Sequence, residues 1–317
     1  MQPKGIIPPV SVELIKKELT QDKFIRHTNH NGNHIYCITA HDSPNTMREI
    51  GRIREMTFRS AGGGTGQEVD IDEFDIGEVP YKQLIVWDPK RKEIIGGYRF
   101  ILGSEAKKDT NGNPILATSH LFRFSDKFIQ EYMPFTIELG RSFIQPNYQS
   151  TGIGRRELFA LDNLWDGLGS LTVIYPNVKF FFGKVTMYPD FNRRARDLIL
   201  YFLNKYFKDN ENLITPIKPL TIETPENELE MILSGKSYHE NYKILSQNVR
   251  QLGEIIPPLI NSYMNLSPTM KVFGTAFNPE FGNSEETGLL ITIKDIYGTK
   301  KDRHILTFII GNKVFKF

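Results

Sequence analysis

The chain has 317 residues, of which 39% are hydrophobic and 24% are charged, and its formal net charge is +2. This composition is typical of a globular protein with one large domain or two ordinary ones, and it excludes a disordered chain. The small net charge gives no reason to expect nucleic-acid binding, and no apolar run approaches the roughly 20 residues that span a bilayer.

The N-terminus has no uninterrupted apolar segment of the signal-peptide type, because Pro8 and Pro9 break its only apolar stretch. The single cysteine, Cys37, excludes an internal disulfide and a cysteine-rich metal site. We therefore expect a cytoplasmic protein without a bound metal. A peripheral contact with the inner face of the membrane stays open.

The N-terminal part of the chain, residues 1–45, is expected to form an arm and the first strand. A short amphipathic helix is predicted over 10–20 and a strand over 34–42. A longer helix is predicted from about Thr46, because apolar residues then recur at helical spacing. The three glycines at 62–64 end that helix, since consecutive glycines disfavour its continuation.

Residues 46–208 are expected to form the core of the fold. After the first long helix and an acidic loop, the predicted elements are a hairpin, a strand, a helix, a strand and a helix, over 81–103, 135–144, 158–168, 179–187 and 192–207. This order is typical of an α/β fold in which helices flank a mixed central sheet.

Residues 209–317 are expected to form a helical excursion and strands that complete the sheet. A Pro- and Thr-rich connection precedes a helical stretch over 226–252. Three strands are then predicted over 271–277, 288–296 and 305–317. We expect them to join the first sheet, because three strands alone give a thin core.

A glycine-rich stretch, QSTGIGRR, lies between a predicted strand and a predicted helix. Gly152 and Gly154 let the backbone approach a ligand, and the first amides of the helix lack intrahelical partners. With the helix dipole and the side chains of Arg155 and Arg156, these amides would form a phosphate site. The alternative is an ordinary turn with a solvated arginine pair, because short glycine patterns often match by chance.

Glu138 and Arg141 flank the end of the strand in IELGRSF. They are three residues apart, so a regular strand would place them on opposite faces. A bulge at Gly140 would bring them together, as a general base and an anion anchor. The alternative is an unrelated pair of surface charges.

Two groups of side chains contain potential metal ligands. Asp70, Asp72 and Asp75 lie in an acidic loop that lacks the pattern of a calcium-binding loop. A solvated loop is the default explanation for them, and binding of an amine substrate is the alternative. The four histidines between positions 27 and 41 fit no structural zinc spacing.

Three arginines, Arg193, Arg194 and Arg196, open a predicted helix. Positive charge is unfavourable at a helix N-terminus. Docking of an acidic partner is one explanation, and a solvated helix face is the other.

Together these motifs resemble the GNAT acyltransferase superfamily. Its acyl-carrier loop follows a Gln/Arg-x-x-Gly-x-Gly/Ala pattern between a strand and a helix, and Gln149, Gly152 and Gly154 match that pattern. Within the superfamily the chain is similar to the ornithine-lipid and glycine-lipid N-acyltransferases, often called haemolysin-like, which are related to acyl-homoserine-lactone synthases. The matching stretches are RIREMTF, DIDEFD, LIVWD, IIGGYRF, ELGRSFIQPNYQ, IIPPLINSYMNL and VFGTAFNPEFG.

The resemblance implies a GNAT-like fold and an N-acyltransferase activity. Enzymes of this type move a long fatty acyl chain, which can carry a 3-hydroxyl group, from acyl carrier protein to the amine of a small amino acid. Glycine and ornithine are the two acceptors implied, and the product would be a precursor of an aminolipid. Whether the donor is acyl carrier protein, through its phosphopantetheine, or acyl-CoA stays open.

Chemistry then suggests roles for particular residues. The attacking amine must be neutral, and Glu138 is the first candidate for its base. Tyr188 is a candidate proton donor to the leaving thiolate. The phosphopantetheine arm is expected to contact Gln149, Gly152, Gly154, Arg155 and Arg156. By similarity to the synthases, the polar pocket is expected to contain Arg54, Arg99, Arg141, Asp72 and Asp75.

Three other functions are open at this point. One is a small-molecule N-acetyltransferase that uses acetyl-CoA, and the arginines near the glycine loop favour an acidic carrier protein over it. The second is a membrane-lytic protein, as the haemolysin label suggests, which no spanning segment supports. The third is a module that binds acyl carrier protein without catalysis.

Overall fold

The structure is a computed structural model that describes residues 3–149 and 159–314. Its strands are β1 (Phe24–His27), β2 (His34–Ile38), β3 (Lys82–Asp88), β4 (Glu93–Leu102), β5 (Phe122–Phe124), β6 (Thr136–Ile144), β7 (Phe180–Met187), β8 (Ile214–Pro216), β9 (Lys271–Asn278) and β10 (Ser284–Thr292). Its α-helices are α1 (Val12–Glu18), α2 (Pro44–Ser60), α3 (Glu73–Ile76), α4 (Ala160–Ile174), α5 (Arg193–Phe207), α6 (Glu226–Ile232), α7 (Tyr238–Gln251), α8 (Pro258–Met264), α9 (Gly298–Lys301) and α10 (Thr307–Val314).

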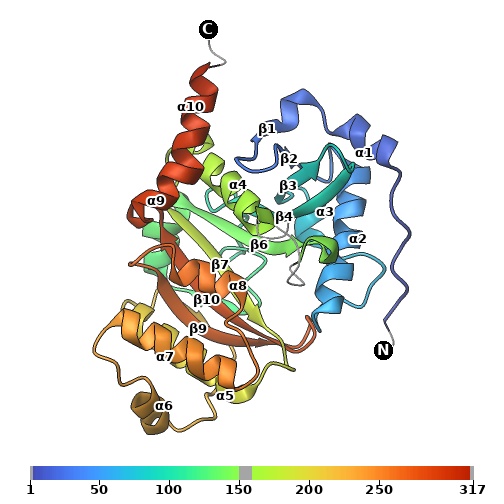
Figure 1. Ribbon diagram of the computed structural model, residues 1–317. Helices are drawn as coiled ribbons and strands as arrows, with labels where there is room; N and C mark the ends of the chain where they lie inside the picture. The colour runs from blue at the N-terminus through green and yellow to red at the C-terminus, as the bar shows by residue number, and fades with distance from the viewer. Residues whose placement is uncertain (1–2, 150–158, 315–317) are drawn as a thin grey trace.

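Eight strands form one central sheet, in the order β1-β2-β3-β4-β6-β7-β10-β9 (Figure 1). Neighbouring strands are antiparallel, except for β6 and β7, which are parallel. The short strands β5 and β8 form a separate pair. The α/β fold with a mixed central sheet that the sequence predicts is therefore confirmed.

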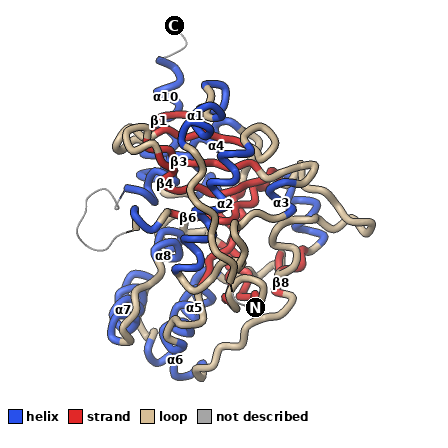
Figure 2. The backbone as a smooth tube through the Cα atoms, turned by 90° about the vertical axis from the view of Figure 1, so that its right-hand side faces the viewer, coloured by secondary structure: helices blue, strands red, loops and turns tan. Residues whose placement is uncertain are grey.

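Helices cover both faces of the sheet (Figure 2). One hydrophobic cluster joins the sheet to α4, α5, α7 and α8, and another joins the opposite face to α1 and α2. Successive side chains of β3 point to opposite faces of the sheet and contribute to both clusters: Leu84 belongs to the first and its neighbour Ile85 to the second.

Helix α2 shows how local sequence sets these layers. Pro44 stands in its first turn, where the missing N–H costs nothing. Met47, Ile50 and Ile53 recur at helical spacing and are buried against the sheet. The helix ends at Ser60, just before Gly62, whose φ of 90° favours glycine.

The C-terminal region agrees with the sequence analysis only in part. β9 and β10 join the central sheet, with β10 antiparallel to β7. The predicted helix over 226–252 is divided into α6 and α7. The strand predicted over 305–317 is wrong, because the described residues of that stretch are helical as far as Val314.

The apolar run in this last stretch misled the prediction. His304 and Phe308, four residues apart, are both buried, and the helical segment that carries them packs on α4. Packing at helical spacing therefore overrides the strand propensity of the isoleucines. Within residues 3–149 and 159–314, no helix combines the length and apolarity needed to cross a bilayer.

Candidate active site

A cavity lies in the sheet where β6 and β7 separate. The two strands pair only through Thr136–Glu138 and Phe180–Phe182, and both continue beyond that point. The space between them forms a central cavity of about 210 Å³. Its strand residues are Leu139, Gly140, Arg141 and Ser142 on β6 and Gly183, Lys184, Val185 and Thr186 on β7.

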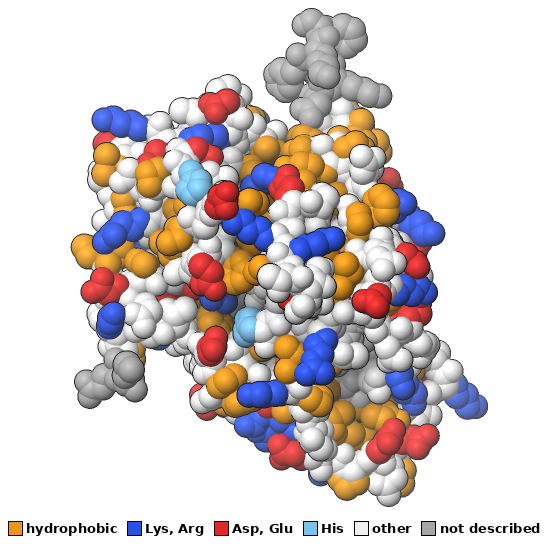
Figure 3. All heavy atoms as spheres, turned by 180° about the vertical axis from the view of Figure 1, so that it is seen from behind, with side chains coloured by type: hydrophobic (Ala, Val, Ile, Leu, Met, Phe, Trp, Pro, Cys, Tyr) orange, Lys and Arg blue, Asp and Glu red, His pale blue; other side chains and the backbone are white. Residues whose placement is uncertain are grey.

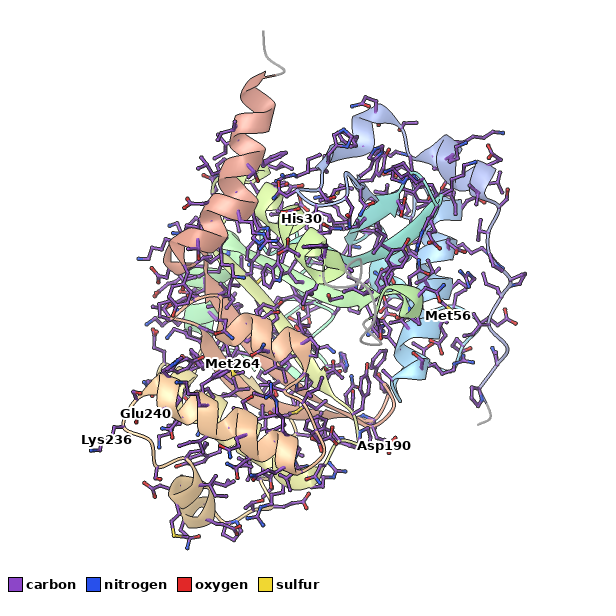
Figure 4. The ribbon with its side chains drawn as sticks, in the orientation of Figure 1. His30, Met56, Asp190, Lys236, Glu240 and Met264 are labelled. Atoms are coloured by element: carbon purple, nitrogen blue, oxygen red, sulfur yellow. The ribbon has the colours of Figure 1, made fainter. Side chains whose placement is uncertain are left out.

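The side of the central cavity next to α4 and α8 is apolar. The Trp165 ring meets the Tyr263 ring edge-on, with 5.6 Å between centroids. In Figure 4, Met264 marks the end of α8, and Met56 marks α2 on the far side of the separating strands. An apolar wall of this kind suits a hydrocarbon chain. Its residues are Leu161, Leu164, Trp165, Leu168, Pro257, Leu259, Ile260 and Tyr263.

The side of the central cavity next to α2 is aromatic and charged. Phe58, Tyr188 and Phe281 line it together with Arg141 and Lys184. The Arg141 guanidinium lies 4.6 Å from the centre of the Phe281 ring, and Lys184 Nζ lies 5.9 Å from the same centre. Both distances allow cation–π attraction. The lining therefore changes from apolar to charged across the sheet.

Beside this charged side, six residues form what we call the arginine–aspartate cluster. The arginines come from α2, β4 and β6, and the aspartates from the loop before α3 and from α3 itself. The Asp72 side chain caps α3 by accepting from the backbone amides of Phe74 and Asp75, which fixes the carboxylates in place. The members of the cluster are Arg54, Arg99, Arg141, Asp70, Asp72 and Asp75.

Two arginines hold Asp75. Arg54 Nη1 lies 3.1 Å from both Asp75 oxygens, and Arg99 Nη1 lies 3.1 Å from Asp75 and 2.6 Å from Asp72. Burial raises the pKa of Asp75, but the two guanidinium groups bring that pKa well below its ordinary value. Asp75 is therefore a structural anion and a poor base.

Arg141 connects the cluster to the central cavity. Its Nε lies 2.9 Å from an oxygen of Asp70, and its Nη2 lies 3.7 Å from Asp72. Burial outweighs this pairing and raises the pKa of Asp70. The sequence indicated only that Asp70 lies in an acidic loop and did not predict its ion pair with Arg141.

The bulge that would bring Glu138 and Arg141 together is present in β6. Gly97 pairs with Phe143 and Arg99 with Gly140, so β6 has one more residue than β4 between these pairs. Arg141 has a φ of 48°, in the left-handed region that few residues other than glycine adopt. The extra residue turns Arg141 toward the same face of the sheet as Glu138.

Glu138 is fully buried beside the cavity and outside its lining. One carboxylate oxygen accepts from the Tyr81 hydroxyl, and the other accepts from Thr118 Oγ1 at 2.6 Å. Burial raises the pKa of Glu138 above its ordinary value, against these hydrogen bonds and the charge of Arg99. A raised pKa makes Glu138 a stronger base, but both of its oxygens accept from hydroxyl groups, and neither Tyr81 nor Thr118 lines the cavity.

Lys184 and Glu286 form an ion pair that the sequence analysis missed. Lys184 Nζ lies 2.6 Å from Glu286 Oε1, and Thr186 Oγ1 donates to Glu286 Oε2 at 2.7 Å. Burial lowers the pKa of Lys184. The sequence did contain a signal for this pair, because a lysine within the apolar run FFFGKVTM predicts a partner of opposite charge. An unpaired charge is rarely buried in a central strand.

Two further side chains near the cavity could bind a ligand. Arg99 Nε is buried and has no hydrogen-bond partner among the described residues, and it lies 3.5 Å from the point that a Cβ on Gly140 would occupy. Tyr188, the residue after β7, lines the cavity, and burial raises the pKa of its hydroxyl. A buried donor without a partner marks a place where a ligand can bind.

The predicted acyl-carrier loop falls mostly outside the described residues. Gly152, Gly154, Arg155 and Arg156 belong to that stretch. Gln149 is described, and its Nε2 donates to the Ile144 carbonyl at 2.6 Å, next to the end of β6.

The arginines that open α5 pair with carboxylates of the same chain. Arg193 and Arg194 pair with Glu285 and Glu228. Arg196 is buried and pairs with Asp197, Glu223 and Glu285. These contacts explain the three arginines without a docking partner. Across the described part of the chain, no group of three or more potential ligands could hold a metal ion.

The chain is similar in sequence to a known domain family and, over nearly its whole length, to two known proteins. Residues 53–155 match the GNAT acetyltransferase domain family. A protein of Bacteroides thetaiotaomicron called glycine N(alpha)-acyltransferase is 60% identical over 96% of this chain and 90% of its own length. A protein of the same name from Phocaeicola vulgatus is 59% identical over 96% of this chain and 93% of its own length.

No solved structure matches the chain. The two relatives nevertheless cover almost all of it, so the resemblance to GNAT N-acyltransferases seen in the sequence is confirmed. The central cavity between diverging strands, with apolar and charged sides, belongs to an enzyme of that kind. The chain is a member of the GNAT family and an N-acyltransferase that takes its acyl group from a thioester donor.

Proposed function

We propose that this enzyme transfers a long fatty acyl chain from acyl carrier protein to the amine of glycine. The observation that carries the proposal is the central cavity, which is apolar beside α4 and α8 and charged beside α2. A fatty acyl thioester needs the first kind of surface and an amino acid needs the second. The names of the two relatives support glycine over ornithine as the acceptor.

The charged side of the cavity suits a zwitterion. Three arginines and three aspartates make up the arginine–aspartate cluster, and Lys184 and Glu286 add one charge of each sign. A site with equal numbers of cations and anions can hold an ammonium and a carboxylate together. We propose that Arg141 and the unpaired Nε of Arg99 bind the carboxylate of glycine.

The reaction requires two proton transfers. Glycine first gives a proton from its ammonium group to a base, and the neutral amine then attacks the thioester carbonyl carbon. The C–N bond forms, and the C–S bond breaks as the tetrahedral intermediate collapses. The nitrogen loses its second proton at this step, and that proton passes to the leaving thiolate. Backbone amides of β6 are our candidates for binding the oxyanion.

We propose that Glu138 is the base, acting through the Tyr81 or Thr118 hydroxyl that touches it. Its raised pKa favours proton acceptance. For Tyr188 we propose a hydrogen bond to the leaving sulfur. Burial raises the pKa of Tyr188, so a thiolate with an ordinary pKa near 8.5 is too weak a base to deprotonate it.

The donor site is proposed to involve the glycine loop of the sequence. Gln149, Gly152, Gly154, Arg155 and Arg156 are the residues that would contact the phosphopantetheine of the carrier. An acidic carrier protein and the free cofactor CoA share this arm, so only an assay distinguishes them.

Purified protein can be given each donor with each acceptor while the released thiol is measured. We expect release with long-chain acyl carrier protein and glycine, with much slower release for ornithine. Faster release from acetyl-CoA than from any long-chain donor would favour a small-molecule acetyltransferase. Absence of thiol release from every combination, with protein shown to be folded, would contradict the proposed function as a whole.

A further inference from the structure

A helical segment at the C-terminal end of the described chain projects from the body of the molecule. We call residues 298–314 the C-terminal helical segment; it comprises α9, a π-helical turn over Asp302–Leu306, and α10. Figure 1 shows α10 extending away from the sheet, and Figure 2 shows the same from the side.

One face of this segment is fixed to the protein. His304 Nδ1 lies 2.7 Å from Asp166 Oδ1 on α4, and Arg26 Nη1 donates to the His304 carbonyl at 3.2 Å. Phe308 is buried one turn further on, with the Arg26 guanidinium 5.5 Å from its ring centre. Gly169 permits this approach, because a Cβ there would lie 2.4 Å from the His304 carbonyl oxygen.

The opposite face is apolar and exposed. Leu306 and Ile310, also one turn apart, are 45% and 53% exposed. They lie about half a helical turn away from His304 and Phe308, so the anchoring contacts leave them free. Figure 3 shows hydrophobic side chains at the surface next to this end of the chain.

The sequence around this apolar face is strongly basic. Residues 298–317 contain Lys300, Lys301, Arg303, Lys313 and Lys316 against one acidic residue, Asp302, which gives a net charge of +4. The whole chain has a net charge of +2, so residues 1–297 together carry −2. Among the described side chains, Arg303 pairs with Asp162 of α4, so Lys300 and Lys301 supply the positive charge in the turn before the exposed apolar face. An exposed apolar face next to basic residues is the combination that binds an anionic lipid surface.

The segment also lies next to the central cavity. Leu161 and Trp165 of α4 line the cavity and also line a second hollow on the outer side, of about 200 Å³. Lys300 of α9 borders that second hollow. An acyl chain leaving the cavity past these two α4 side chains would thus arrive beside the C-terminal helical segment.

We propose that the C-terminal helical segment docks the enzyme on the surface of an anionic lipid bilayer. Leu306 and Ile310 enter the boundary between headgroups and acyl chains, and the neighbouring lysines contact anionic headgroups. The described helix of eight residues lies in this boundary and does not span the membrane. This placement gives the acyl chain of the product a route into the lipid bilayer. That route, unlike the docking itself, rests on the proposed function.

The test is binding of the purified full-length chain to vesicles. One set of vesicles contains phosphatidylethanolamine alone, and the other contains that lipid and phosphatidylglycerol in equal parts. The test variant carries Leu306→Gln and Ile310→Gln, since glutamine is polar and keeps helix propensity. The matched control carries Met231→Gln and Ile255→Gln, at sites that are 68% and 65% exposed elsewhere on the surface.

We expect the unchanged protein and the control variant to sediment with the mixed vesicles, and the test variant to bind about tenfold more weakly or worse. Equal binding of the test variant and the unchanged protein would overturn the proposal, as would equal binding to both vesicle types. Gel filtration adds a further outcome: a dimer that the test variant alone dissociates, without vesicle binding, would identify the face as a contact between two copies.

An assay of thiol release with a dissolved donor, run on the same proteins without vesicles, tests the proposed function separately from vesicle binding. The test variant should retain normal turnover in that assay, because its substitutions lie outside the central cavity. An inactive unchanged protein that still binds vesicles would contradict the proposed function and leave the docking surface standing.

Discussion

Arg54 is a fully buried arginine whose guanidinium bonds to Asp75 and to the amide of Gln83. Its partner Asp75 is equally buried and shares a second arginine, Arg99. Such an arrangement is stable only while every charge keeps a counterion, because an unpaired charge in the interior is costly. The cluster therefore fixes α2, α3 and β4 relative to one another.

Replacing Arg54 should show this dependence. We expect Arg54→Met to lower the free energy of unfolding by about 3–5 kcal/mol, because Asp75 then keeps one counterion in a buried site. Urea denaturation measures the change. The control is Lys107→Met, which removes an exposed pair with Glu78 and should cost about 1 kcal/mol or less. Similar losses in both variants would refute the account.

Glu138 tests the chemistry at the same scale. We expect Glu138→Gln to lower turnover by a factor of about 10²–10⁴, the range typical of a lost general base. In the unchanged enzyme, turnover should fall as pH falls through the pKa of Glu138, which lies above 4.5, since only the carboxylate accepts a proton. The variant should lose that acid limb.

Thiol release across a pH series measures both effects. Glu105→Gln, at an exposed carboxylate paired with Lys82, serves as the control and should leave the profile unchanged. A variant at Glu138 with normal turnover, or with the same acid limb, would rule Glu138 out as the base.

At the scale of secondary-structure elements, α4 supplies one apolar wall of the central cavity. Leu164 is buried in that wall, so a larger side chain there should occupy space needed by the far end of an acyl chain. We expect Leu164→Trp to lower kcat/KM for long acyl donors at least about tenfold while shorter donors are less affected. Assays with donors of graded length measure this.

The control for that change lies on the same helix. Ile174 is 40% exposed at the end of α4 and outside the cavity lining. Ile174→Trp should leave the preference for chain length unchanged. A uniform loss of activity on all donors in the Leu164 variant would point to misfolding in place of altered selectivity.

The elements also show what sequence reasoning can reach. The periodic apolar positions of α2, and the two apolar runs of β3 and β4 joined by a charged turn, were sufficient to predict these elements, because these signals are local in the sequence. Strands β5 and β8 have three residues each, too few for a periodic signal. The turn over Asp302–Leu306, which precedes the last helix, packs against a distant glycine, Gly169, and no local pattern reveals that contact.

The candidate site divides in the same way. Arg54, Asp72, Asp75, Arg99 and Arg141 were named from the resemblance, and the structure brings them into contact. Their roles, like those of Glu138 and Tyr188, stay predictions. Lys184 and Glu286 were missed because they lie about 100 residues apart and meet only through the pairing of β7 with β10.

At the scale of the whole molecule, the sheet depends on strands from both ends of the chain. β10 pairs with all eight residues of β7, from Phe180 to Met187. A chain of residues 1–208 would leave β7 as an exposed edge and would remove Phe273, which packs against Phe182. Residues 46–208 can therefore form an independent domain only if their part of the sheet is stable without β9 and β10.

We expect the chain cut after Lys208 to lack a cooperative thermal transition, because its central sheet loses an interior pairing partner. A chain cut after Tyr297 keeps β9 and β10 and should retain a cooperative transition with a lower midpoint. Circular dichroism during heating distinguishes the two. A sharp transition in the shorter chain would show that the core folds without the C-terminal strands.

The equal numbers of arginines and aspartates in the cluster beside the cavity also bear on how substrates arrive. Opposite charges held within a few ångströms cancel at distances beyond the Debye length, about 8 Å at physiological ionic strength. Glycine would then meet the site by unguided diffusion, and its KM should stay nearly constant as sodium chloride is raised. Vesicle binding by the C-terminal helical segment should weaken over the same range, because salt screens the attraction between exposed lysines and anionic headgroups. A single sodium chloride titration would therefore distinguish glycine binding, which depends on short-range contacts, from vesicle binding, which depends on longer-range electrostatic attraction.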